Sequence, residues 1–279
     1  MKKIALVAAT IGLLASASFA AQATTPEEDL KNFREYFMKR FPGVPLNEFQ
    51  NGVYAINADA RSSWEAIEEF PPYEDAVDKG KKLFNTPFAN GKSYASCFKN
   101  GGIGIRQNYP YFDSNSGKVK TLEGEINECR VKNGEKPLGW GKGDIADISA
   151  YMASTANGKP LNIKVPNDPR ALAMYNRGKQ HFYAKRGQLN LSCANCHQDN
   201  AGNRIRGDIL SPALGHVTHF PVWRLKWDGL GTIDRRYDGC NKQVRAKPFK
   251  AQSDEYVALE YFETYMSNGI EVNAPSTRK

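Results

Sequence analysis

The residues of this chain that are best suited to chemistry lie in one short motif near position 195. The motif is Cys193-Ala-Asn-Cys196-His197, in which two thiols lie three positions apart and a histidine follows the second one. Two cysteines on one turn of a helix can each add to a vinyl group of haem, and the adjacent histidine can then bind the iron. The motif therefore predicts one covalently attached haem of the c type.

Two other kinds of site also use paired cysteines. A thioredoxin-like redox pair needs a surrounding strand–helix–strand pattern, and the sequence near residue 193 has no such pattern. A zinc site needs a second Cys/His pair at ligand spacing, for which His216 and His219 are the candidates. The export pattern at the amino terminus favours the haem interpretation over both.

The amino terminus has the pattern of a secretory signal peptide. Met1-Lys-Lys precedes an apolar run over residues 4–14, and small residues continue to Ala23. A membrane anchor is the alternative, but the run is far shorter than the roughly 20 apolar residues that span a bilayer. We predict that residues 1–23 are a signal peptide and that the mature protein is periplasmic, with no membrane span.

The charge of the chain restricts its partners. Removing the signal peptide lowers the formal net charge from +8 to +6. A modest basic excess favours anionic substrates or acidic partners, although a solvated basic surface accounts for most such charges. The sequence has no long Lys/Arg run and no nucleic-acid motif, so we expect no nucleic-acid partner.

The chain contains a weak internal duplication, in which four segments match in the same order. They are residues 79–84 with 177–182, 94–98 with 193–197, 127–129 with 238–240, and 147–152 with 260–266. Each unit therefore consists of a helix, a cysteine site, a long loop, a second cysteine and a C-terminal helix. This is the order of elements in a small all-helical cytochrome c domain, whose first and last helices pack together.

We predict a mainly α fold with two tandem cytochrome c-like domains, the first without haem. Residues 71–160 are expected to form the haemless domain and residues 161–279 the haem-binding domain. The boundary between them rests on the Gly-Lys-Pro and Pro-Asn-Asp-Pro sequences, which interrupt helices. Residues 24–70 are amphipathic in part and are expected to form an N-terminal helical extension.

The first unit lacks two of the three residues that attach haem. Tyr94 takes the place of the first thioether cysteine, and Phe98 takes the place of the histidine. The unit keeps Cys97 and Cys129, which we expect to form a disulfide in an exported protein. Closing a loop of about 32 residues contributes roughly 3 to 4 kcal/mol. A pair of buried free thiols is the alternative.

The second axial ligand of the iron is less certain from the sequence than the first. Met266 and Met174 are methionines of the second unit, but Met266 matches Met152 of the haemless unit and so has a packing explanation. His216 and His219 are a second choice.

Cys240 is the cysteine left over after one disulfide and two thioether bonds. We place it in the loop after the haem motif, where a distal iron ligand would originate. Nearby positive charge favours the thiolate, which binds metals and attacks sulfur, and it also attracts anions. A solvated basic loop with a buried thiol is the alternative. Five cationic residues lie within seven positions of Cys240, namely Arg235, Arg236, Lys242, Arg245 and Lys247.

Taken together, these residues resemble the SoxA family, the catalytic cytochrome subunits of the SoxAX complex of sulfur-oxidising bacteria. The similarity covers essentially the whole mature chain, including residues 51–55, 71–74 and the haem motif. It is most specific in Arg236-Tyr-Asp-Gly-Cys240-Asn-Lys-Gln-Val-Arg-Ala246. The chain is similar to the single-haem members, because Tyr94 and Phe98 remove the first attachment site.

The resemblance implies an L-cysteine S-thiosulfotransferase that oxidatively couples thiosulfate to a carrier-protein cysteine. It implies one haem c on Cys193 and Cys196, with His197 and Cys240 as axial iron ligands. Cys240 is then the catalytic residue and the site of a persulfide, and Arg236 binds the anionic substrate. The implied partners are a SoxX-like haem subunit, a SoxYZ-like carrier protein and an electron-accepting cytochrome c.

The missing first haem also bears on the partner. Joining two nucleophilic sulfurs removes two electrons, and one haem accepts only one, so a second haem is expected on another subunit. The main rival is a periplasmic electron-transfer cytochrome c without sulfur chemistry of its own. A subunit that only anchors a catalytic cytochrome is a third possibility, which the haem motif and the basic residues around Cys240 disfavour.

Overall fold

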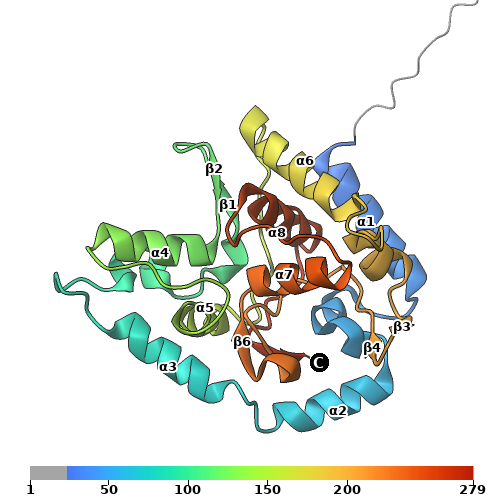
Figure 1. Cartoon of the computed structure of the whole chain (residues 1–279), viewed down its shortest axis with the longest axis horizontal. Helices are drawn as coiled ribbons and strands as arrows, with labels where there is room; N and C mark the ends of the chain where they lie inside the picture. Colours follow the sequence, from blue (N-terminus) through green and yellow to red (C-terminus); the bar gives the residue numbers. More distant parts are fainter. Residues whose placement is uncertain (1–23, 279) are drawn as a thin grey trace, which may run out of the picture.

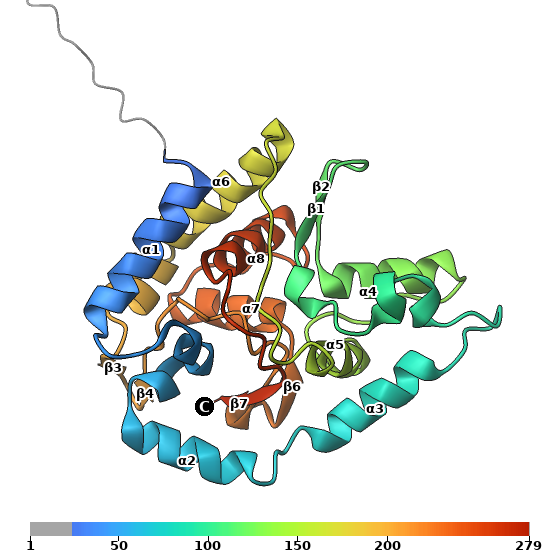
Figure 2. The same cartoon turned by 180° about the vertical axis from the view of Figure 1, so that it is seen from behind.

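The computed structural model describes residues 24–278 and is predominantly helical, as the sequence predicts (Figures 1 and 2). The predicted signal peptide, residues 1–23, lies outside the described residues. The helices are α1 (Pro26–Arg40), α2 (Ala58–Glu68), α3 (Glu74–Asn85), α4 (Leu122–Lys132), α5 (Asp144–Ser154), α6 (Pro169–Tyr183), α7 (Ile233–Gln243) and α8 (Asp254–Met266). None of these helices is long and apolar enough to cross a membrane.

Short strands connect the helices. β1 (Tyr111–Asp113) and β2 (Lys118–Lys120) form one antiparallel hairpin, and β3 (Arg204–Ile205) and β4 (Asp208–Ile209) form another. β5 (Val222–Arg224) is the central strand of a three-stranded sheet. It pairs antiparallel with β6 (Gly229–Gly231) and parallel with β7 (Ser276–Arg278), so the last described strand lies beside β5.

The two predicted cytochrome c-like units are present, and in each the first helix packs on the last. α3 crosses α5, and α6 crosses α8. A glycine permits each crossing: a Cβ atom on Gly80 would lie 2.0 Å from the carbonyl oxygen of Asp147, and one on Gly178 would lie 2.0 Å from that of Ala258. Only a residue without a side chain allows backbones to approach this closely.

The crossings also correct the predicted alignment of the last helices. Gly80 meets Asp147 in the first unit and Gly178 meets Ala258 in the second, so Asp147 and Ala258 occupy equivalent positions in α5 and α8. Counting forward, Met152 is equivalent to Glu263 and not to Met266. The match of Met152 with Met266 is therefore wrong by about one helical turn. Met266 is nevertheless buried in the hydrophobic core, as a packing residue would be.

Aromatic side chains fill the interior of the first unit. Tyr94, which replaces a thioether cysteine, is 1% exposed, stacks on Phe84 and meets Phe88 edge to face. Its hydroxyl accepts a hydrogen bond of 3.0 Å from Arg130. The predicted disulfide between Cys97 and Cys129 is present beside this cluster.

The segment before the first unit packs on the second one. Helix α1 lies alongside α6 in both views (Figures 1 and 2), and Phe33 meets Phe182 edge to face. Asp29 accepts hydrogen bonds of 2.7 Å from Lys179 and 2.8 Å from Tyr175. The end of the following 3-10 stretch, Leu46–Ala55, lines the cavity of the functional site.

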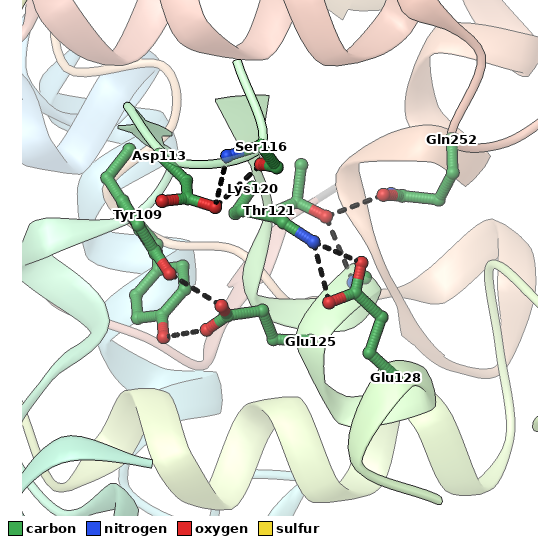
Figure 3. A network of polar contacts seen from close by, with 10 residues as sticks. Tyr109, Asp113, Ser116, Lys120, Thr121, Glu125, Glu128 and Gln252 are labelled. Carbon is green, nitrogen blue, oxygen red and sulfur yellow. Dashed lines mark hydrogen bonds and ion pairs between the residues drawn. The ribbon is translucent and has the colours of Figure 1, made fainter. Parts of the chain in front are cut away.

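Polar contacts join the two units. Thr121, the N-cap residue of α4, donates a hydrogen bond of 2.5 Å to Gln252 in the second unit, close to the ion pair of Lys120 with Glu128 (Figure 3). Gln252 in turn donates a bond of 2.7 Å from its side-chain amide to Asp234 at the start of α7. One side chain thus connects the first turns of α4 and α7.

Candidate functional site

The haem motif lies on a short helical segment that its own side chains hold in place. The backbone N–H of Asn195 donates to the hydroxyl of Ser192 at 3.0 Å, and the N–H of Ser192 donates to the side chain of Asn195 at 3.1 Å. The segment then widens into a π-helical turn, Asn195–Asp199, a feature that is frequent at functional sites. Cys193, Cys196 and His197 all line one cavity.

The imidazole of His197 is oriented for metal binding. It is 8% exposed, and its Nδ1 lies 2.9 Å from the carbonyl oxygen of Ser211. A carbonyl only accepts, so Nδ1 carries the proton and Nε2 keeps its lone pair. Burial holds the pKa of His197 well below its usual range. A neutral imidazole whose Nδ1 is bonded to a backbone carbonyl is the form that binds iron.

The two motif thiols are not arranged as a redox pair. They are not joined in a disulfide. Burial raises the pKa of Cys193 well above its usual value and also raises that of Cys196. Redox-active Cys-x-x-Cys pairs depend on a lowered thiol pKa, so the surroundings of this pair do not support the thioredoxin-like alternative.

Helix α7 supplies Arg236 and Cys240 to the same cavity. The two residues are four positions apart, so they lie on one face of the helix. The prediction that Cys240 lies in a loop is wrong: it is in the third turn of α7 and has a free thiol. The buried residues Tyr237 and Asn241 lie on the adjacent flank of the helix and hold it against α8, with the Asn241 side chain donating to the hydroxyl of Tyr256 at 3.2 Å.

The cavity has a volume of about 360 Å³, within the usual range for ligand and cofactor sites. Two adjacent thiols, an imidazole with a free Nε2 and a cavity therefore occur together. These residues fit a covalently attached haem, with Cys193 and Cys196 as attachment points and His197 as an iron ligand.

Comparison with known proteins agrees with this geometry. A family model described as the SoxA/TsdA cytochrome c domain matches residues 79–161 and 177–272. The chain is 56% identical to the L-cysteine S-thiosulfotransferase subunit SoxA of Chlorobaculum tepidum, covering 91% of this chain and 88% of the relative. It is 52% identical to the corresponding Allochromatium vinosum subunit, covering 92% of each. This chain belongs to the SoxA family.

A solved structure supports the assignment of the fold. The chain is similar to a chain in the crystal structure of SoxXA from P. pantotrophus, with a TM-score of 0.71 and 34% identity, covering 78% of this chain and 84% of that one. The family model matches both units of the duplication. Membership of the SoxA family implies haem c as the cofactor.

Three of the other candidate ligands of this SoxA-family chain, the two methionines and His216, are placed less favourably. Met266 is in the core, Met174 lies in a groove next to Val257, and neither lines the haem cavity. The rings of His197 and His216 have centroids only 4.4 Å apart. Two imidazoles on opposite sides of one metal need about 6 Å, because each metal–nitrogen bond takes about 2 Å. His219 also lines the cavity and is buried, so it stays a candidate ligand.

The structure adds cavity residues that the sequence did not reveal. Glu263 of α8 accepts a hydrogen bond from the hydroxyl of Tyr237 and lies 3.7 Å from Nδ1 of His216. It occupies the position that Met152 fills in the first unit. Among the charged residues of the wall, arginines outnumber the acidic residues. In addition to Arg236, they are Arg186, Arg204, Arg206, Arg224 and Arg278, against the acidic residues Asp59, Asp208 and Glu263.

Proposed function

We propose that this chain is the catalytic SoxA-type subunit of an L-cysteine S-thiosulfotransferase, which couples thiosulfate oxidatively to a cysteine of a carrier protein. The observation that carries the proposal is the position of Cys240 and Arg236. They share one face of α7 and line the same cavity as Cys193, Cys196 and His197. The names of relatives at 56% and 52% identity support the activity.

The proposed cofactor is one haem c, attached to Cys193 and Cys196 and bound by His197 and Cys240. When bound, the haem supplies one-electron redox chemistry close to the sulfur of Cys240. The first unit contributes none, since Tyr94 and Phe98 stand where its attachment residues would be.

The balance of the reaction defines what the protein must provide. The terminal sulfur of thiosulfate and the sulfur of the carrier thiolate form one S–S bond, and two electrons are released. A carrier that enters as a thiol also releases one proton. No other bond to sulfur breaks. The site must therefore bind a dianion, hold a sulfur in place and pass two electrons on.

Arg236 and Cys240 meet the first two requirements. The planar guanidinium of Arg236 offers several N–H donors to the oxygens of thiosulfate. Cys240, one helical turn further along α7, presents its thiol to an anion held there. We propose that Cys240 holds thiosulfate covalently. Its thiolate and the terminal sulfur of thiosulfate form an S–S bond as two electrons leave, and the carrier thiolate then attacks that terminal sulfur and releases the Cys240 thiolate.

The electron balance requires partners. Because one haem would accept only one electron, we propose that a SoxX-like haem subunit provides the second acceptor and that an electron-accepting cytochrome c is the final partner. The similar chain from P. pantotrophus belongs to a complex named SoxXA, which supports such a subunit. A SoxYZ-like protein is the proposed carrier, and the signal-peptide pattern supports a periplasmic location.

A Cys240→Ala variant tests the proposal directly. We expect the haem to remain attached, its absorption spectrum to shift because an axial ligand is lost, and thiosulfate-dependent turnover to fall at least 100-fold. A Cys97→Ser/Cys129→Ser variant is the matched control, because it removes the equivalent helix cysteine away from the cavity. An unchanged spectrum together with normal turnover in Cys240→Ala would establish the electron-transfer cytochrome instead.

A further inference from the structure

Two buried arginines lie side by side on the wall of the cavity formed by the three-stranded sheet. Arg224 ends β5 and Arg278 ends β7, and the two are register partners in the parallel pair. They are 8% and 9% exposed. Both line the cavity that holds the haem motif, but they approach it from the sheet, whereas Arg236 approaches it from α7.

The guanidinium of Arg278 is held rigidly and bonds to uncharged oxygens. It donates to the hydroxyl of Ser276 at 2.6 Å, to the carbonyl of Thr277 at 2.8 Å and to the carbonyl of Gln50 at 3.1 Å. The ring of Tyr54 lies beneath it, with its centroid 5.1 Å away. An arginine that is fixed in this way loses little conformational entropy when an anion binds.

One donor of Arg278 has no hydrogen-bond partner within residues 24–278. This is the buried Nε–H. A buried donor without an acceptor costs about 1–3 kcal/mol, so its presence beside a cavity indicates an oxygen that enters with a ligand. The charge of the neighbouring Glu68 acts on Arg278, but the carboxylate bonds to the backbone N–H of Thr277 and the hydroxyl of Tyr73 and leaves the Nε–H of Arg278 without an acceptor.

The charge of the pair points in the same direction. Burial lowers the pKa of both Arg224 and Arg278 to about 10, and the nearby Arg236 contributes to the shift of Arg224. Both therefore remain cationic at neutral pH. The positive charge of Arg236 acts against that of the buried Arg224, and a ligand that brings negative charge offsets this cost.

We propose that Arg224 and Arg278 form a second oxyanion subsite in this cavity, separate from Arg236. The ligand chemistry is a carboxylate or a sulfur oxyanion, whose oxygens accept from the fork of Arg278 and are neutralised by Arg224. Such oxygens are available from the propionates of the haem or from the substrate. This inference rests on the proposed haem site and identifies which residues of the sheet neutralise the anions bound there.

The test compares Arg278→Gln with Lys226→Gln, which removes one positive charge from an exposed position two residues after Arg224. Resonance Raman spectra of the holoprotein report the propionate vibrations, and calorimetry with sulfate reports binding of an unreactive oxyanion. A shift of the propionate bands in Arg278→Gln alone assigns the subsite to the haem. A loss of sulfate affinity of about tenfold, with unchanged bands, assigns it to the substrate.

The proposed subsite is overturned if the propionate bands and the sulfate affinity of Arg278→Gln both match those of Lys226→Gln. An Arg278→Lys variant covers the case in which the glutamine variant does not fold. It keeps the charge but loses the fork, so the same readout should move in the same direction by a smaller amount, and no movement also overturns the proposal. Failure of the proposed function is distinguished separately, because haem bound to Cys193 and Cys196 is measured by peptide mass in the unsubstituted protein.

Discussion

Cys129 and Cys240 occupy the same position in two equivalent helices. Each is the eighth residue of an eleven-residue helix, α4 or α7, that follows a threonine N-cap. Cys129 is joined to Cys97, whereas Cys240 has a free thiol that lines the haem cavity. The duplicated scaffold thus presents a thiol at the same point twice. Where the haem motif is lost the thiol closes a disulfide, and where it is kept the thiol faces the cofactor site.

We predict that Arg236→Gln raises the KM for thiosulfate by about tenfold or more and leaves the haem attached, because a charge-assisted hydrogen bond contributes about 1.5–3 kcal/mol. Arg235→Gln is the matched control. Its guanidinium lies 4.4 Å from the ring of Trp227 and donates to the carbonyl of Leu230. Steady-state kinetics on both variants with the full complex test the prediction, and equal effects would contradict a specific role for Arg236.

The sequence was sufficient to predict the residues whose chemistry is encoded locally. The haem motif, the disulfide pair and the cationic surroundings of Cys240 are all short-range patterns. The helix around Cys240 was not predictable in this way, because Asp238, Gly239 and Asn241 have low helix propensity. Packing of the buried Tyr237 against α8 stabilises this helix instead.

Features that depend on distant segments were missed for a physical reason. Arg224 and Arg278 are 54 positions apart and become neighbours only through pairing of three-residue strands, which carry no usable periodicity. The register of α8 was misplaced because almost every residue from Tyr256 to Met266 is buried. A helix that is buried on all sides has no polar face to mark its rotation.

The disulfide leads to a prediction about stability. Replacing both Cys97 and Cys129 by serine should lower the free energy of unfolding of the first unit by roughly 3 to 4 kcal/mol, because the unfolded chain gains the freedom of a 32-residue loop. Denaturation with guanidinium chloride measures this. Haem attachment and turnover should be unchanged, since neither residue lines the cavity. A loss of haem in this variant would show that the two units depend on each other more closely.

The helix crossing in the haem unit leads to a second prediction about stability. Gly178→Ala places a Cβ atom 2.0 Å from the carbonyl oxygen of Ala258, so α6 and α8 must separate, at a cost of about 3 kcal/mol or more. Gly239→Ala is the control, because a Cβ atom there meets nothing within 4 Å and alanine favours a helix by about 0.5–1 kcal/mol. The midpoint temperature of thermal unfolding should therefore fall in Gly178→Ala and rise in Gly239→Ala. A similar small change in both variants would contradict the close crossing.

The connection between the two units leads to a prediction about pH. Burial raises the pKa of Asp234 to about 6, although it accepts two hydrogen bonds from Gln252, and the charge of Glu123 adds to the increase. The folded protein therefore holds this proton more tightly than the unfolded chain, and stability falls as the pH rises from about 4 to 7.

Asp234→Asn removes this titration. The quantity to follow is the free energy of unfolding of the variant minus that of the unsubstituted protein. It should rise by up to about 3 kcal/mol between pH 4 and pH 7.5. Any effect of the amide that does not depend on pH only adds a constant to this difference. Glu123 and Glu260 are present in both proteins, so their contributions largely cancel in this difference. Parallel stability curves for Asp234→Asn and the unsubstituted protein would show that Asp234 does not titrate between the folded and unfolded states.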